Sequence, residues 1–166
     1  NSTVGLVQLR VKTKREFLPQ VLDLMVEILR EPKLDASELE VLRRQVLTGI
    51  ESSLTEPQAL APLAVSRKLS PYGKDDVRYV PTLTEELEMY RGVTIEQIRQ
   101  LHSDFIGANV GEVSAVGDFD SSELKAKLVQ SLKGWKSKQP YARVERPAFT
   151  DISGSVERIQ TPDKSN

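Results

Sequence analysis

The predicted fold is decided by the stretch Asn109-Val-Gly-Glu-Val-Ser-Ala-Val-Gly-Asp-Phe-Asp120, which leads into a helix-patterned segment ending at Trp135. Its apolar residues predict a short buried strand, and its Gly-Asp dipeptide predicts a sharp turn. Asp120 and Glu123 then have the spacing of a helix N-cap and capping box. Leucines at four-residue intervals continue one helix face up to Trp135. We therefore expect a strand at the centre of a sheet and a helix that covers it.

The segments before and after this stretch predict further strands and helices around the same sheet. A capping-box pattern, Thr13-x-x-Glu16, precedes an apolar stripe that Pro32 ends. Alternating residues predict outer strands at 4–11 and 155–161. The expected fold is therefore α+β, an antiparallel sheet backed by several helices. Further helices are expected at about 35–50, 57–69, 84–90 and 94–105.

Composition limits the classes of partner. The chain has 166 residues, of which 39% are hydrophobic and 28% charged, as expected for a soluble domain with a core. Its 23 basic and 24 acidic residues give a net charge of -1, which argues against a nucleic-acid partner. No run is long and apolar enough for a membrane-spanning segment. The first residue is not Met, and we expect a processed product or a segment of a longer protein.

The content of cysteine and histidine argues against a metal site of the chain's own. Cysteine is absent and His102 is the single histidine, whereas a catalytic zinc normally takes three protein ligands. We therefore assign no metal ligand, no cofactor and no catalytic residue to this chain. The absence of cysteine fits both the bacterial periplasm and the bacterial cytoplasm, so localisation stays open.

The longest predicted loop carries the candidate binding residues. It runs between two prolines, from Ser70 to Pro81, and contains Tyr72, Arg78 and Tyr79. Loops of this length often carry function, and these side chains suit a peptide backbone or a carboxylate. The alternative is an ordered connector with aromatic residues on its surface.

A second candidate group combines Asp118, Asp120 and His102 as acid–base residues of an independent hydrolase. Helix capping explains the aspartates more economically, because they lie two residues apart across a turn. A lone histidine beside an apolar helix face is more often structural than catalytic. The mid-helix Gly49 is unusual, since glycine there costs about 1 kcal/mol relative to alanine. Close packing against a neighbour is its ordinary explanation.

Taken in order, several phrases resemble the insulinase/pitrilysin family of zinc metallopeptidases, which includes the mitochondrial processing peptidases. The resemblance covers roughly residues 5–135 and implies an antiparallel sheet backed by helices. The phrases are Leu18-Pro-Gln-Val-Leu-Asp-Leu, Leu29-Arg-Glu-Pro32, Leu34-Asp-Ala-Ser-Glu-Leu-Glu40, Thr55-Glu-Pro57, Val93-Thr-Ile-Glu-Gln97, Val116-Gly-Asp-Phe-Asp120 and Gly134-Trp135.

The chain departs from this family at the metal site. Active members carry H-x-x-E-H, which does not occur here. Their third ligand is a glutamate before the Glu-Pro phrase, and counting back from Pro57 places Gly49 at that position. The resemblance therefore implies a domain without its zinc ligands, with zinc held elsewhere in the parent protein.

The resemblance implies a division into residues 1–147, a partial non-catalytic peptidase domain that lacks its first strands and a helix, and residues 148–166. The second part would be a linker and the entry strand of a following domain. The implied function is a wall of the peptidase chamber and a surface for peptide substrates, with other domains of the same peptidase as partners. The alternative is a structural scaffold without proteolysis, as in some processing-peptidase relatives.

Overall fold

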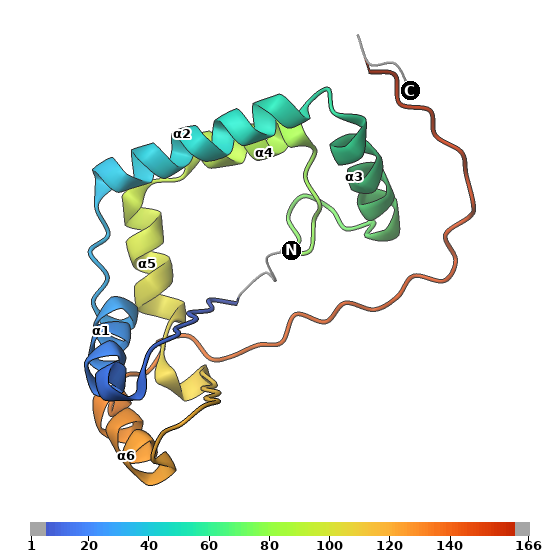
Figure 1. The fold of residues 1–166 in the computed structure, drawn as a ribbon. Helices are drawn as coiled ribbons and strands as arrows, with labels where there is room; N and C mark the ends of the chain where they lie inside the picture. Colours follow the sequence, from blue (N-terminus) through green and yellow to red (C-terminus); the bar gives the residue numbers. More distant parts are fainter. Residues whose placement is uncertain (1–5, 162–166) are drawn as a thin grey trace. The chain divides into compact units, whose positions relative to one another are not determined.

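The computed structural model describes residues 6–161, and all regular structure within this range is helical (Figure 1). Each helix forms where the apolar spacing of its residues or the residues at its N-terminus favour a helix. The elements are η1 (Arg15–Phe17), α1 (Leu18–Arg30), α2 (Ala36–Ser53), α3 (Pro57–Leu69), α4 (Leu83–Gly92), α5 (Ile95–Phe105), η2 (Ala108–Val110) and α6 (Ser121–Leu132), where η denotes a 3-10 helix.

The chain divides into two compact units. The first contains Asn1–Leu34 and Arg99–Tyr141, and the second contains Asp35–Ile98 and Ala142–Asn166. Helices α1 and α6 pack together within the first unit, and α2 and α4 pack together within the second. Each unit therefore joins segments that are far apart in the sequence.

In the first unit, polar contacts join α6 to α1. Asp120 is the N-cap of α6, as predicted, and its carboxylate accepts hydrogen bonds from the amides of Ser122 and Glu123, each at 2.9 Å. Lys127 on α6 forms a 2.6 Å ion pair with Asp23 on α1. The predicted Thr13 cap is wrong, because α1 begins after a 3-10 turn and has no side-chain cap.

In the second unit, Arg43 of α2 binds the C-terminal end of α4. Its guanidinium donates to the carbonyl oxygens of Arg91 at 2.9 Å and Val93 at 2.5 Å. These carbonyls lack partners within the helix, so the contact both satisfies them and places a positive charge at the negative end of the helix dipole. Ile50 of α2 and Leu87 of α4 are the buried apolar residues of this unit among those described.

The predicted antiparallel sheet, and with it the α+β half-domain of the processing-peptidase type, is wrong for residues 6–161. Part of the central predicted strand is the 3-10 turn η2, and the residues after it form no strand. Val116 is fully exposed, and the segments 6–11 and 155–161 form no strand either. A strand needs a hydrogen-bonding partner, which an apolar pattern alone does not supply. Val4 and Gly5 of the first predicted strand lie outside the described residues.

The predicted division between residues 147 and 148 stays a prediction. The chain from 136 to 161 has neither helix nor strand, which is the irregular backbone expected of a linker. The predicted entry strand at 155–161 does not form, and residues 162–166 lie outside the described residues.

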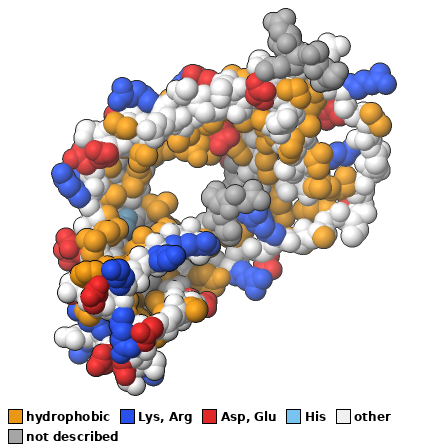
Figure 2. All heavy atoms as spheres, in the orientation of Figure 1, with side chains coloured by type: hydrophobic (Ala, Val, Ile, Leu, Met, Phe, Trp, Pro, Cys, Tyr) orange, Lys and Arg blue, Asp and Glu red, His pale blue; other side chains and the backbone are white. Residues whose placement is uncertain are grey.

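Much apolar surface is left uncovered on individual elements. Within residues 6–161, the buried apolar side chains are those of Val26, Ile50 and Leu87. By contrast, Leu101 and Phe105 of α5 are 56% and 57% exposed. Figure 2 shows many hydrophobic side chains at the surface of the face that it draws. No described helix combines the length and apolar character needed to cross a bilayer.

Replacing Gly49 by alanine should stabilise the second unit. A Cβ built at Gly49 meets no atom within 4 Å, so there is room beside this position and close packing against a neighbour, the alternative explanation of the glycine, is wrong. We expect Gly49→Ala to raise the free energy of unfolding by about 1 kcal/mol, measured by urea denaturation.

Gly134 provides the matched control, because its φ of 73° lies in the left-handed region that alanine disfavours. Gly134→Ala should lower the free energy of unfolding by about 1–2 kcal/mol. A lower stability for Gly49→Ala would contradict the open environment of this glycine.

Candidate functional site

The candidate site is the loop between α3 and α4, where the sequence places Tyr72, Arg78 and Tyr79. The loop is ordered by its own backbone, because the amide of Asp76 donates to the carbonyl of Gly73 at 3.0 Å and that of Tyr79 donates to the carbonyl of Asp76 at 2.9 Å. These turns bring Tyr72 and Arg78 together on one part of the loop. Tyr79 lies in a different set of contacts.

Arg78 is held by Asp76 and covers Tyr72. The Arg78 Nε and Nη2 atoms donate to the two oxygens of the Asp76 carboxylate at 2.8 and 2.7 Å. The Arg78 guanidinium carbon lies 4.0 Å from the centroid of the Tyr72 ring, which is a cation–π contact. The hydrogen bonds from Arg78 lower the pKa of Asp76 to about 2, so this carboxylate is ionised at neutral pH. The guanidinium is thereby fixed with Nη1 available for another acceptor.

Glu85 of α4 anchors the other end of the loop. Its carboxylate accepts hydrogen bonds from the Tyr79 hydroxyl at 2.7 Å and the Thr82 amide at 2.9 Å, and it pairs with Lys74. The hydrogen bond from Lys74, followed by those from Thr82 and Tyr79, lowers the pKa of Glu85 below its usual range. The Arg67 guanidinium lies 5.6 Å from the Tyr79 ring centroid. Tyr79 therefore holds the loop to α3 and α4, while Tyr72 and Arg78 face another segment.

That other segment belongs to the chain itself. The Arg78 Nη1 atom donates to the backbone carbonyl of Glu145 at 3.0 Å. The ring of Phe149 meets the ring of Tyr72 edge-on, with centroids 5.4 Å apart and planes at 72°. Lys68 of α3 donates to the hydroxyl of Ser155. Tyr72 and Arg78 thus hold an irregular peptide segment through one backbone carbonyl and one aromatic side chain.

Most side chains of the segment that Tyr72 and Arg78 hold are exposed to solvent. Residues 141–160 are exposed apart from Phe149 and Ile152, which are partly buried. The Tyr72 hydroxyl oxygen is buried and has no hydrogen-bond partner within the described part of the chain. A buried hydroxyl without a partner costs free energy, so this segment does not satisfy every polar group of the site.

Sequence reasoning missed the residues that support this loop. Thr82 and Glu85 form a capping box at the start of α4, and their spacing is a signal that the predicted start at Thr84 overlooked. The Asp76–Arg78 pair is also close in sequence. No spacing in the sequence indicated Phe149, because it contacts the loop from a distant part of the chain.

The second candidate group is not assembled into one site. Asp118 forms a 2.5 Å ion pair with Arg15, and Asp120 caps α6. The Nε2 atom of His102 hydrogen-bonds the carbonyl oxygen of Leu29 at 2.8 Å. Each side chain therefore has its own structural partner, which gives no support to the hydrolase hypothesis.

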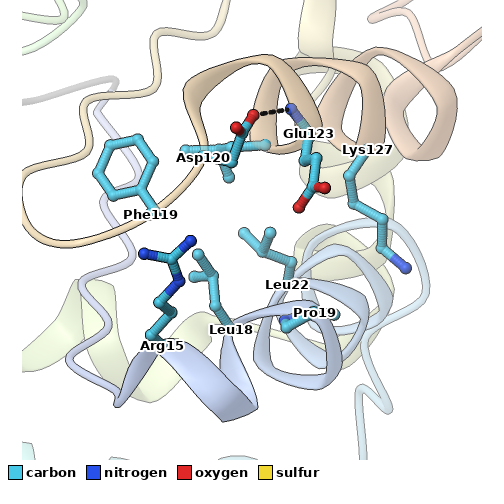
Figure 3. A pocket seen from close by; sticks show the side chains of 9 residues that line it. Arg15, Leu18, Pro19, Leu22, Phe119, Asp120, Glu123 and Lys127 are labelled. Carbon is cyan, nitrogen blue, oxygen red and sulfur yellow. Dashed lines mark hydrogen bonds between the residues drawn. The ribbon is translucent and has the colours of Figure 1, made fainter.

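A cleft of about 240 Å³ lies between α1 and α6, beside Asp120 (Figure 3). Leu18 and Leu22 contribute apolar lining from α1. The charged residues Arg15 and Lys127 also line it, but each already forms an ion pair with an aspartate. The cleft therefore has a small apolar interior without an arrangement of free reactive groups.

The chain does not fit a zinc ion at the position implied by the resemblance. Gly49 offers no ligand, and its carbonyl accepts hydrogen bonds from the hydroxyls of Ser52 at 2.8 Å and Ser53 at 2.9 Å. Over residues 6–161, no group of three or more histidine, cysteine, aspartate or glutamate side chains is placed to hold a metal ion. No catalytic step through zinc can therefore be built on these residues.

Comparisons with protein-family models, with curated proteins and with solved structures give no match. The family resemblance of the sequence phrases therefore remains a prediction.

Removal of the α6 cap should destabilise the first unit. Asp120→Ala leaves the first amides of α6 without their acceptor, and we expect a loss of about 0.5–2 kcal/mol in the free energy of unfolding. Asp120→Asn should lose much less, since asparagine is an equally common cap. Urea denaturation of both variants checks this, and equal losses would show that charge rather than capping is important.

Acid should release the loop between α3 and α4. The pKa values of Asp76 and Glu85 are lowered in the folded chain, so their contribution to stability is complete above their ordinary values of 3.8 and 4.5 and is lost as the pH falls below them. We expect the thermal midpoint to fall between about pH 5 and pH 2, with a shallower fall in Glu85→Gln. An unchanged slope in Glu85→Gln would contradict the role of Glu85.

Proposed function

We propose that this chain is a non-catalytic segment of a multi-domain zinc metallopeptidase and that it supplies a surface for peptide substrates in irregular or extended form. The observation that carries the peptide-binding part is the contact of Arg78 and Tyr72 with the backbone carbonyl of Glu145 and the ring of Phe149. Zinc and the catalytic residues would come from another part of the parent protein.

The contacts at the loop are of a kind that suits many peptides. A guanidinium that binds a backbone carbonyl recognises a group present in every residue of a peptide. An aromatic ring that packs against another ring adds a preference for aromatic side chains. Because Asp76 fixes the guanidinium and Glu85 fixes the loop, little conformational entropy is lost when a peptide binds.

The peptidase part of the proposal rests on the order of the sequence phrases in the resemblance. Leu34–Glu40 contains the N-cap of α2, and Thr55–Pro57 leads into α3. Val93–Gln97 leads into α5, where the backbone amides of Thr94 and Gln97 each donate to the side-chain oxygen of the other residue, and Val116–Asp120 ends at the cap of α6. The phrases therefore coincide with starts of helices, which is where local sequence has the largest effect.

Exposed apolar side chains support partners within a larger protein. Large apolar surfaces are uncommon on a chain that acts alone and often mark contacts with other domains. Leu101 and Phe105 on α5, together with Leu6 and Val7, are more than half exposed. We propose that other domains of the same peptidase cover part of this surface.

Binding of a peptide can be tested by nuclear magnetic resonance. The ¹⁵N-labelled chain would be titrated with a synthetic peptide, two repeats of Ser-Val-Lys-Phe-Thr-Glu, up to about 1 mM, the range of weak binding. We expect saturable shifts of the amide signals of Tyr72 and Arg78, without cleavage of the peptide. Arg78→Ala should abolish them, and Lys133→Ala, at an exposed position, should not.

The titration also separates the two functions that the sequence allows. An absence of shifts at Tyr72 and Arg78 in both the unmodified chain and Phe149→Ala would overturn the peptide-binding function and favour a scaffold without proteolysis. Shifts that persist in Arg78→Ala would place the binding elsewhere on the chain.

A further inference from the structure

We infer that the segment 145–155 occupies the peptide site as an internal ligand, and that the external partner of the site is a peptide with an aromatic side chain four residues after the carbonyl bound by Arg78. This inference rests on the proposed peptide-binding function and adds the form of the ligand and its regulation. Glu145 supplies that carbonyl and Phe149 the aromatic ring.

The spacing between the two contacts defines the ligand. Glu145 and Phe149 are separated by Arg146, Pro147 and Ala148, and none of these residues is buried. Pro147 disfavours a helical conformation at the residue before it, which keeps this part of the segment from folding on itself. The site therefore binds a backbone carbonyl and an aromatic ring four residues apart, and it leaves the side chains between them in solvent.

The internal ligand is held weakly enough to be displaced. Its polar and ring contacts with the loop and α3, among the described residues, are one backbone hydrogen bond, one ring contact and one bond from Lys68 to Ser155. Within residues 6–161 the Tyr72 hydroxyl has no hydrogen-bond partner, so a peptide that offers it a hydrogen bond would bind better. Being part of the same chain, the segment acts at a high effective concentration and lowers the apparent affinity for external peptides.

Phe149→Ala tests this directly in the full chain. A fluorescein-labelled peptide with the sequence Glu-Arg-Pro-Ala-Phe-Thr-Asp-Ile, that of residues 145–152, would be titrated by fluorescence anisotropy. We expect Phe149→Ala to bind it about 3- to 10-fold more tightly than the unmodified chain, because an internal aromatic competitor is lost. Phe149 lies outside the helices, and an unchanged circular dichroism spectrum would show that the fold is kept.

Two controls isolate the ring contact. Val156→Ala changes a side chain of the same segment that is 90% exposed, and it should leave the affinity unchanged. The labelled peptide with alanine in place of its phenylalanine should bind about 3- to 10-fold more weakly to the Phe149→Ala chain.

The outcomes distinguish the inference from the proposed function. If Phe149→Ala and Val156→Ala bind the peptide as the unmodified chain does, the internal ligand is overturned while peptide binding stands. If neither this peptide nor the repeat peptide binds to any of the chains, both are overturned.

Discussion

The carboxylate of Glu85 is the contact on which the candidate site depends. It receives hydrogen bonds from the Tyr79 hydroxyl and the Thr82 amide and pairs with Lys74, so it joins the loop to the first turn of α4. Because these donors come from both ends of the loop, the carboxylate fixes a segment that has no secondary structure of its own. Helix α4 is in turn held by Arg43 of α2 at its other end. The position of Arg78 and Tyr72 thus follows from the packing of α2 and α4.

Three helix starts could be predicted from the sequence because their causes are local. Asp35, Asp120 and the Thr94–Gln97 pair make the expected contacts with amides two or three residues away. The sheet could not be predicted correctly, because strands need partners from elsewhere in the chain. Val113 and Val116 have an apolar strand pattern, yet both are exposed. An alternating pattern shows only that a segment would suit a sheet.

The candidate site shows the same distinction between local and distant contacts. Tyr72, Arg78 and Tyr79 could be selected from the sequence because they share one loop between prolines. Their separate roles could not, since Tyr79 is bound by Glu85 on α4 and Tyr72 contacts Phe149, which is 77 residues away in the chain. From spacing, only the Asp76–Arg78 pair and the Thr82–Glu85 capping box could have been proposed.

The uncovered apolar segments also affect how the chain behaves at high concentration. Leu6–Val11 and Val110–Val116 are rich in β-branched and leucine side chains and carry backbone amides without a sheet partner. Segments of this composition add readily to the edges of strands in other molecules. We therefore expect the chain to aggregate through these two segments at high concentration, and charged substitutions at Val113 or Val116 to reduce this aggregation.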